Sequence, residues 1–522
     1  MEVFMKELLV RIKNALGRLE DCVRRFPFSF VYLCLITFTG SYQIISENEK
    51  FEAIIALILG GLFCFLMELS YEYGIHGYRL LSPVSSLAVS VVAYFLLKTF
   101  ENEYTYTAVF GLAVAAVSLI CYILYKDREN RNLFSSLMKS AFIVQVFVCV
   151  ILSGFSVCIA AFHFLIFNFQ NVWKLYGVIF LSVFVLFGIT LFLSYVPRPK
   201  EDAEVPSIYR TMIHKALFYI YLILIGILYL YILKIIISWK MPVGKLNWFG
   251  SFALLFYVFF YLSVDETDGR IQGIFKNYGA YLLLPVLAIQ LFAIVIRLNA
   301  YGLTTARYVS LILIGIAVCF MLSNIFRFSV SKCFLIIPVL ALLFTCSPLN
   351  VYDVPNRVQE HRLKSALIKG GALINGVLDD TVKMKAEYLE DVKSAYDYLK
   401  WSEGKKSSFF NDFAESKIVS SFYDLDYDEN YISFHYSYNL EEKQIDIGEY
   451  NSMRILSGEE TDQYQEDLTA FFLSLEENDN GEMLACKLSD GSRIIFEYID
   501  YLYDPESSGF EELFWRGILF TK

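Results

Sequence analysis

Long apolar stretches recur between residues 26 and 349, and they constrain the fold more than any other feature of this sequence. A helix needs about 20 mostly apolar residues to cross the hydrocarbon core of a bilayer, because no water is present there to bind its backbone groups. The chain is also 56% apolar and only 19% charged. The sequence therefore predicts a membrane protein and argues against an ordinary water-soluble enzyme.

Eleven of these stretches are predicted to be transmembrane helices, give or take one. One stretch, 134–167, is overlong, and the last contains a proline, so either can change the count. The predicted fold is an α-helical polytopic membrane bundle of about 11 transmembrane helices, followed by a C-terminal α+β soluble domain. The predicted spans are 26–45, 51–69, 83–97, 106–125, 141–162, 175–195, 216–237, 248–262, 281–296, 308–325 and 333–349.

The net charge changes sign near residue 350. Residues 1–349 carry +8, whereas residues 350–522 carry 17 Lys and Arg against 35 Asp and Glu, or −18. We predict three parts: an amphipathic N-terminal helix (1–25), a multi-spanning transmembrane domain (26–349) and an acidic α+β soluble domain (350–522). The lipid bilayer is the expected partner, with a protein partner possible for the acidic domain. Nucleic acid is not expected, since that domain would repel phosphates. The oligomeric state is left open.

Basic residues indicate the orientation, because cytoplasmic loops are enriched in Lys and Arg. The N-terminal segment and the alternate loops that follow hold 19 of them, and the opposite loops hold 7. We therefore expect a cytoplasmic N-terminus, and eleven spans would place the C-terminal domain outside. The first 25 residues lack the apolar core of a signal peptide. Their apolar residues recur at helical spacing, which favours a helix along the inner membrane face or one packed on the protein's own loops.

Residues 350–522 show helical patterns first and strand patterns later. Helices are predicted over 357–369, before two glycines, and over 383–401. Apolar and polar residues alternate from 431 to 438, which predicts a half-buried strand. Two more strands, 484–488 and 494–498, flank Asp490-Gly491, a pair typical of hairpin turns. Cys486 is the only cysteine of this region and cannot form a disulfide within it.

No known catalytic, metal-binding or cofactor-binding motif occurs in the sequence. The five histidines are scattered, with no pair at the spacing that shares a helix face. An acidic run, Asp424, Asp426, Asp428 and Glu429, departs from the calcium-binding EF-hand pattern in its sixth and twelfth positions. We interpret this run as an acidic loop, and we predict no catalytic residue, no metal ligand and no cofactor.

The turn between the ninth and tenth predicted spans is the main candidate site. Arg297 and Arg307 flank Tyr301, Gly302 and Thr304 in this turn. Two guanidinium groups at the level of the lipid headgroups could bind a phosphate or a carboxylate. Arginines that only anchor helix ends against headgroups would give the same pattern.

Three polar residues within the predicted spans are further candidates. Glu68 lies near the end of its span, so its charge is expected to reach the membrane interface. Gln145 and Gln290 can hydrogen-bond between helices without a role in transport. A channel through the bundle would require a polar cavity lined by residues such as these three.

Short motifs extend from residue 25 to residue 363. They are Arg25-Phe26-Pro27, Trp248, Arg297, Tyr301-Gly302-Leu303-Thr304, Arg307-Tyr308, Ser347-Pro348-Leu349, Gln359 and Arg362-Leu363. Together they resemble a bacterial family of polytopic membrane proteins, of the domain of unknown function 4153 type. The resemblance covers nearly the whole chain and implies a multi-pass protein of the bacterial plasma (inner) membrane with ten to twelve spans and a C-terminal soluble domain. It implies no activity and no catalytic residue.

Two functions are compatible with these features. The first is an integral membrane protein of the bacterial cell envelope that acts in transport, sensing or scaffolding, with the tail domain as a partner-binding module. The two-part charge distribution and the missing catalytic motifs favour this first function. They favour a protein that is not an enzyme over one that is. The alternative is a membrane enzyme that acts on a lipid-linked or phosphorylated substrate at the outer face, with Arg297, Tyr301 and Arg307 holding the anionic group.

Overall fold

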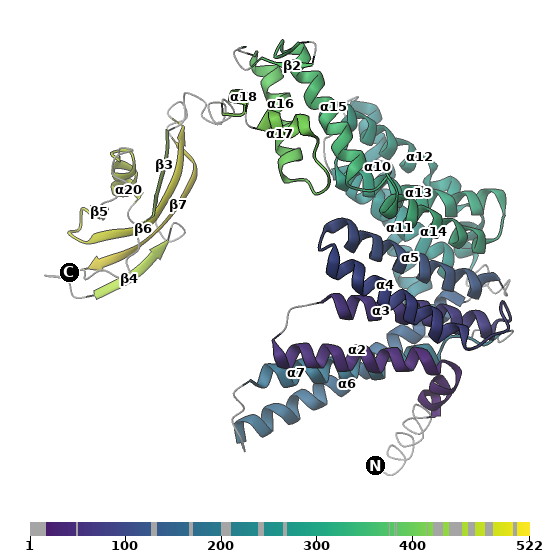
Figure 1. The fold of residues 1–522 in the computed structure, drawn as a ribbon. Coiled ribbons are helices and arrows are strands. Elements are labelled where there is room, and N and C mark those ends of the chain that lie inside the picture. The colour runs from purple at the N-terminus through teal and green to yellow at the C-terminus, as the bar shows by residue number, and fades with distance from the viewer. Residues whose placement is uncertain are drawn as a thin grey trace. The chain divides into compact units, whose positions relative to one another are not determined.

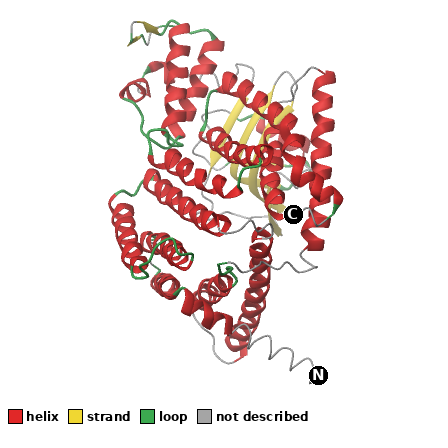
Figure 2. Cartoon of the chain, turned by 90° about the vertical axis from the view of Figure 1, so that its right-hand side faces the viewer, coloured by secondary structure: helices red, strands yellow, loops and turns green. Residues whose placement is uncertain are grey.

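The computed structural model comprises two compact units (Figure 1). The first is formed by Met1–Leu373 with Lys385–Phe410, and the second by Ile374–Met384 with Asn411–Lys522. Helices make up most of the structure, and its strands form one sheet and one short hairpin (Figure 2). The structure describes residues 17–47, 51–126, 133–165, 171–199, 210–238, 245–264, 269–374, 376–379, 382, 384–414, 416–420, 432–437, 452–457, 465–475, 484–504 and 509–521.

Each of the eleven predicted apolar stretches overlaps a helix of the first unit. Two of them contain π-helical segments, in which each N–H bonds five residues back. The helices are α2 (Pro27–Ser46), α3 (Glu52–Glu72), α4 (Leu81–Thr99), α5 (Glu103–Lys126), α6 (Leu133–Leu165), α7 (Val172–Leu181) continued by η1 (Ser182–Ile189) and α8 (Thr190–Ser194), η2 (Arg210–Leu217) continued by α10 (Phe218–Ser238), α11 (Lys245–Ser263), α12 (Arg270–Tyr301), α13 (Thr305–Phe326) and α14 (Val330–Cys346).

The surface of these helices is too apolar for water. Within the described residues, nine helices are long and apolar enough to cross a membrane, and α14 and the part of α11 from Phe249 to Ser263 are shorter apolar helices. At most half of the residues in each of the nine apolar windows are buried. Large side chains such as Phe38 and Ile237 stay 73% and 76% exposed. A lipid bilayer is the environment that suits such a surface, so the chain is an integral membrane protein.

Small residues allow several helices to approach closely. A Cβ atom added at Gly60 of α3 would overlap the hydroxyl group of Ser90 on α4, and one at Gly111 of α5 would overlap Thr345 on α14. The Ser90 hydroxyl group also lies 3.1 Å from that of Tyr32 on α2. Between helices in lipid, close packing and interhelical hydrogen bonds replace the hydrophobic effect as the source of stability. These glycines therefore position α3 against α4 and α5 against α14.

Pro338 interrupts the hydrogen bonding of α14. A proline has no backbone N–H, so the carbonyl group of Phe334, four residues earlier, loses its helical donor. The hydroxyl group of Ser118 on α5 donates to this carbonyl oxygen at 2.7 Å. The proline expected to complicate the last span is therefore accommodated by a polar side chain from the neighbouring helix.

Two polar helices, α15 (Asp353–Lys369) and α16 (Ala386–Trp401), complete the first unit. Both lie where the sequence predicts helices. The first begins four residues earlier than predicted, because the Asn350 side-chain oxygen accepts the N–H groups of Tyr352 and Asp353 at 3.0 and 2.8 Å. It ends before Gly371, whose φ of +78° suits glycine.

The second unit contains an antiparallel sheet in the order β3-β6-β7-β4, with β5 paired to β6. β3, β5 and β6 lie at the predicted positions, and Gly491 in the predicted turn has a φ of +84°. Phe472 of α20 packs with Phe496 and Trp515 of the sheet in one apolar core.

The acidic run 424–429 and residues 1–16 lie outside the described residues. The remaining elements are β1 (Leu373–Ile374), β2 (Val377–Leu378), α17 (Ser408–Ala414), α18 (Lys417–Ser420), β3 (Ile432–Ser437), β4 (Ser452–Ser457), α20 (Gln465–Phe472), β5 (Ala485–Lys487), β6 (Arg493–Asp504) and β7 (Gly509–Thr521).

The bond between Ser118 and the proline break leads to a stability prediction. Ser118→Ala should lower the free energy of unfolding by about 0.6–2 kcal/mol, the range for interhelical hydrogen bonds in lipid, because the Phe334 carbonyl group loses its donor. Thermal unfolding in detergent micelles measures this. Ser153→Ala is the matched control, since that hydroxyl group bonds only to Cys149 of its own helix. In a Pro338→Ala background the effect of Ser118→Ala should shrink; equal losses in both backgrounds would contradict the assignment.

Candidate functional site

The candidate turn between α12 and α13 is a tight reversal centred on Gly302. Gly302 has φ +68° and ψ −176°, a backbone conformation that is essentially restricted to glycine. A Cβ atom at this position would lie 2.8 Å from Nε2 of Gln359 on α15. Glycine is therefore required both by the conformation of the turn and by the proximity of α15.

The two arginines of the turn differ in their surroundings. Arg307 donates from Nη1 to the carbonyl oxygen of Gly302 at 2.6 Å, and its guanidinium carbon lies 5.6 Å from the centre of the Tyr301 ring. Arg297, by contrast, forms no hydrogen bond or ion pair with any residue that the structure describes. The positive charges of Arg297 and Arg362 both act on Arg307. One guanidinium group is thus used inside the turn, and a second lies near it without a counter-charge.

Helix α15 supplies the groups that hold the turn. Gln359, which is 1% exposed, donates from Nε2 to the carbonyl oxygens of Tyr301 and Leu303 at 2.9 and 3.1 Å. Arg362 also donates to the Tyr301 oxygen at 3.2 Å and forms an ion pair with Asp391 of α16 at 2.6 Å. The carbonyl groups exposed by the turn are therefore bound by side chains that follow more than 50 residues later in the chain.

Helix α16 caps the start of α13. Thr304 has the extended conformation of an N-cap residue but makes no capping hydrogen bond with its side chain. The hydroxyl group of Tyr398 accepts the N–H of Thr305 at 3.0 Å instead and lies 2.9 Å from the Thr305 hydroxyl group. A tyrosine from another helix thus provides the hydrogen bond that an N-cap side chain usually provides.

The connection between α14 and α15 joins the same assembly. Tyr308 of α13 donates to the carbonyl oxygen of Leu349 at 3.0 Å. Tyr104, in the first turn of α5, donates to Asp353 and accepts the N–H of Lys405 at 2.7 Å. We call this assembly the α15 junction, and it consists of Tyr104, Arg297, residues 301–308 and 349–353, Gln359, Arg362, Asp391 and Tyr398. It fixes α15 and α16 to the ends of α5, α12, α13 and α14.

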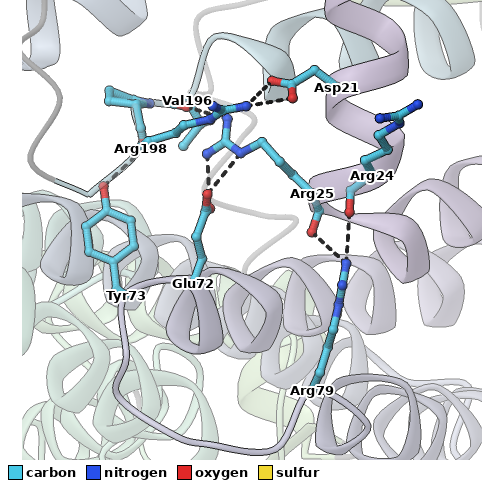
Figure 3. Close-up of polar contacts among 9 residues, drawn as sticks. Asp21, Arg24, Arg25, Glu72, Tyr73, Arg79, Val196 and Arg198 are labelled. Carbon is cyan, nitrogen blue, oxygen red and sulfur yellow. Dashed lines mark hydrogen bonds and ion pairs between the residues drawn. The ribbon is translucent and has the colours of Figure 1, made fainter.

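A second polar junction lies at the start of α2 (Figure 3). Arg25 donates from Nε and Nη2 to the two carboxylate oxygens of Glu72, each at 3.0 Å, and from Nη1 to the carbonyl oxygen of Val196 at 2.9 Å. The side chains of this ion pair are only 9% and 23% exposed. Such a bidentate, three-way contact joins the helix that precedes α2, the end of α3 and the segment after α8.

Two more arginines complete this Arg25 junction. Arg79 donates to the carbonyl oxygens of Arg24 and Arg25 at 2.9 and 3.3 Å, and Arg198 contacts both carboxylate oxygens of Asp21 at 2.6 and 2.7 Å. Each of these guanidinium groups has an internal partner. The Arg25 junction therefore acts as a structural clamp and offers no open anion site through these three side chains.

Glu68 has a structural role that the sequence did not indicate. Its side chain was expected to reach the membrane interface, but Glu68 is only 2% exposed. The carboxyl oxygens accept the N–H groups of Phe28 and Ser29 at 3.0 Å and the Ser29 hydroxyl group at 2.5 Å. The residue thus caps the N-terminus of α2, where the helix dipole favours negative charge.

The three candidate intramembrane residues lie on different helix pairs. Glu68 joins α3 to α2, and Gln290 of α12 donates to Ser251 of α11 at 2.8 Å. Gln145 of α6 is exposed, and its one hydrogen bond among the described residues is to Cys149 of its own helix, at 3.5 Å. In the described part of the chain, these three side chains do not line one cavity, and the channel that would have required them to do so loses its basis.

Comparison with protein families identifies the family of this chain. A family model described as Domain of unknown function (DUF4153) matches residues 28–393. The chain belongs to this family. The matched range includes every residue of the α15 junction except Tyr398, and it ends within α16, before the five-stranded sheet of the second unit. Comparisons with curated proteins and with solved structures gave no match.

Within this DUF4153 chain, the motif residues meet in space although they are distant in sequence. Tyr301–Thr304, Arg307-Tyr308, Leu349, Gln359 and Arg362 all belong to the α15 junction, and Arg25 belongs to the other one. Sequence reasoning noted Gln359 and Arg362 but gave them no role, and it missed Glu72, Asp353 and Tyr398. A glutamine and an arginine three residues apart on an otherwise polar helix offered no signal of what they would bind.

The conformation of Gly302 gives a direct test of the α15 junction. Gly302→Ala should destabilise the protein by about 1–3 kcal/mol, the cost of a backbone region reserved for glycine, and the new methyl group would also press on Gln359. The melting temperature in detergent measures this. Gly315→Ala on α13 is the matched control, because its Cβ would meet nothing within 4 Å, and it should be neutral or stabilising. Equal melting temperatures for the two variants would contradict the role of Gly302.

Proposed function

We propose that the chain is a multi-pass protein of the bacterial plasma membrane with eleven crossings, a cytoplasmic N-terminus and an extracytoplasmic C-terminal domain. In this proposal, residues 1–25 form an amphipathic cytoplasmic helix, 26–349 the transmembrane domain and 350–522 the acidic soluble α+β domain. Nine spanning helices and two shorter apolar ones among the described residues support the count. Arg25, Arg79 and Arg198, which gather at one end of the helices, support the orientation, since positive charge favours the cytoplasmic side.

The biochemical role that we propose is sensing or scaffolding without catalysis, with the tail domain as a partner-binding module. One observation carries this proposal: the polar side chains of four motif residues are used for internal hydrogen bonds. Gln359 and Arg362 bind the turn, Arg307 binds Gly302, and Arg25 binds Glu72. Hydrogen bonds between helices couple a movement of one helix to a movement of the next. Such coupling suits a protein that connects an external domain to a membrane bundle.

Transport is less well supported than sensing or scaffolding. Carriers that couple to ions place ionisable groups inside the bundle, where they bind the ion or proton. Among the described helices, the buried Glu68 caps α2 near one helix end, and Lys234 of α10 is exposed. Neither position suits a central ion-binding site.

One observation favours an enzyme as the second candidate. Arg297 forms no ion pair with a described residue and lies near the positive charge of Arg307. Two guanidinium groups that lack a carboxylate partner attract phosphate or carboxylate. The alternative function is therefore a membrane enzyme that acts on a lipid-linked or phosphorylated substrate at the outer face, with Arg297 as the group that first contacts the anion.

Cysteine labelling tests the proposed orientation. Native Cys486 is a poor probe, since burial raises the pKa of its thiol to about 11 and keeps it protonated and unreactive. We therefore use Lys487→Cys, an exposed neighbour, and Lys332→Cys, an exposed position in the first turn of α14. A membrane-impermeant maleimide should modify Lys487→Cys on intact spheroplasts and Lys332→Cys only after lysis. Labelling of both variants from the same side would refute a membrane crossing by α14.

Two variants of the α15 junction, at Arg297 and at Gln359, distinguish the two proposed functions. In a strain whose only copy is the variant, Arg297→Gln should preserve growth and lipid profile at normal membrane levels, because this side chain supports no internal contact. Gln359→Leu should reproduce the null strain, because it releases the turn from α15. Growth and extracted lipids are the measurements. If Arg297→Gln alone gave the growth and lipids of the strain that lacks the protein, while the variant stayed folded, the enzyme would be the better supported function.

A further inference from the structure

An apolar cavity of about 740 Å³ lies between α3, α4, α5 and α14 of the first unit. Its walls combine aliphatic side chains such as Leu59 and Leu112 with small ones such as Ala93 and Ala108. Alanines at these positions leave space that larger residues would fill. Ligand sites typically have volumes of about 300–1,000 Å³ and mostly apolar walls, so the cavity has the size and composition of a binding site.

The polar groups in the wall of this cavity are confined to one end. Tyr104 and Thr105 lie in the first turn of α5, Thr345 and Cys346 in the last turn of α14, and Asn350 follows that helix. The other residues in the wall are apolar. A molecule that fits this pattern has a long apolar part and one polar end.

The cavity opens on the apolar surface of the helices. Val92, Leu96, Leu112 and Leu342 belong to its wall and are 57%, 43%, 43% and 38% exposed. Three of the four surrounding helices, α3, α4 and α5, are candidate membrane spans. The cavity is therefore continuous with the surface that contacts lipid, and acyl chains are the molecules that surround its opening.

We propose that this cavity binds one acyl chain of a membrane phospholipid, with the glycerol and ester region at Tyr104, Thr105 and Asn350. Lipid tails are as apolar as the wall, so the hydrophobic effect does not drive this transfer. Close packing against the alanines favours the bound lipid over bulk lipid, and the polar residues at one end match the polarity of its glycerol and ester region. A helix of a second copy fits less well, because a transmembrane helix is about 10–12 Å wide and would not place polar atoms at one end only.

Photo-crosslinking with a defined lipid tests the proposal. The full-length protein is reconstituted in nanodiscs that contain phosphatidylglycerol with a diazirine on one 16-carbon chain, and the crosslinked peptides are mapped by mass spectrometry. We expect crosslinks concentrated in α5 and α14 over the other exposed apolar helices. Ala108→Phe or Ala88→Phe, which fill the cavity from α5 or α4, should lower them by about tenfold, equivalent to 1.4 kcal/mol. Ala161→Phe on the exposed face of α6 is the matched control and should leave them unchanged.

Each other outcome overturns the proposal. Crosslinks spread evenly over the apolar helices would show only bulk lipid, and crosslinks in α5 and α14 that persist at the same level in both filled variants at unchanged melting temperature would place the lipid elsewhere. Peptides crosslinked between two chains at Cys346, detected with a bifunctional maleimide, would assign the cavity to a second copy. The proposal rests on the membrane location alone. Its failure would leave the sensing or scaffolding role untouched, and failure of that role would not change the crosslinks.

Discussion

The need to satisfy backbone groups in an environment without water determines how the helices of this protein are joined. At four described helix ends or breaks, a polar side chain from another helix binds the free backbone group. Ser118 binds the carbonyl group that Pro338 leaves free, and Glu68 binds the first N–H groups of α2. Gln359 binds the carbonyl groups around Gly302, and Tyr398 caps α13. Each bond satisfies a backbone group that would otherwise be left unpaired, and each is expected to contribute about 0.6–2 kcal/mol to stability.

These bonds also account for most of the polar side chains that looked functional. Glu68 is a glutamate in an apolar stretch, and Arg307 is an arginine next to a glycine turn, so both are typical of catalytic or transport sites. Both instead bind groups of their own chain. Two features are not explained in this way. Arg297 forms no ion pair with the described residues, and the apolar cavity beside α5 opens on the surface of the helices. Functional chemistry is best sought at these two places.

The sequence was sufficient to predict the helices but not their partners. Among the described residues, hydropathy located nine helices of spanning length and two shorter apolar ones, because the bilayer thickness imposes a length that a single sequence reveals. The alternation of apolar and polar residues, together with the Asp490-Gly491 pair, located β3, β5 and β6, whereas β4 and β7 were missed. Within the site, the glycine turn was identified, but the roles of Gln359 and Glu68 were not. Their partners lie about 40 to 60 residues away, and the sequence pattern does not report such distances.

The two junctions differ in charge, and this difference bears on what each can bind. At the Arg25 junction, carboxylates of Glu72 and Asp21 face two of the three arginines, and backbone carbonyl groups bind the third. At the α15 junction, Asp391 faces Arg362, while Arg297 and Arg307 lack such a carboxylate among the described residues. Arg307 is held by carbonyl oxygen and ring contacts, which leave its charge uncompensated. An anion drawn to this protein would therefore meet the α15 junction, close to the connection that borders the polar end of the cavity.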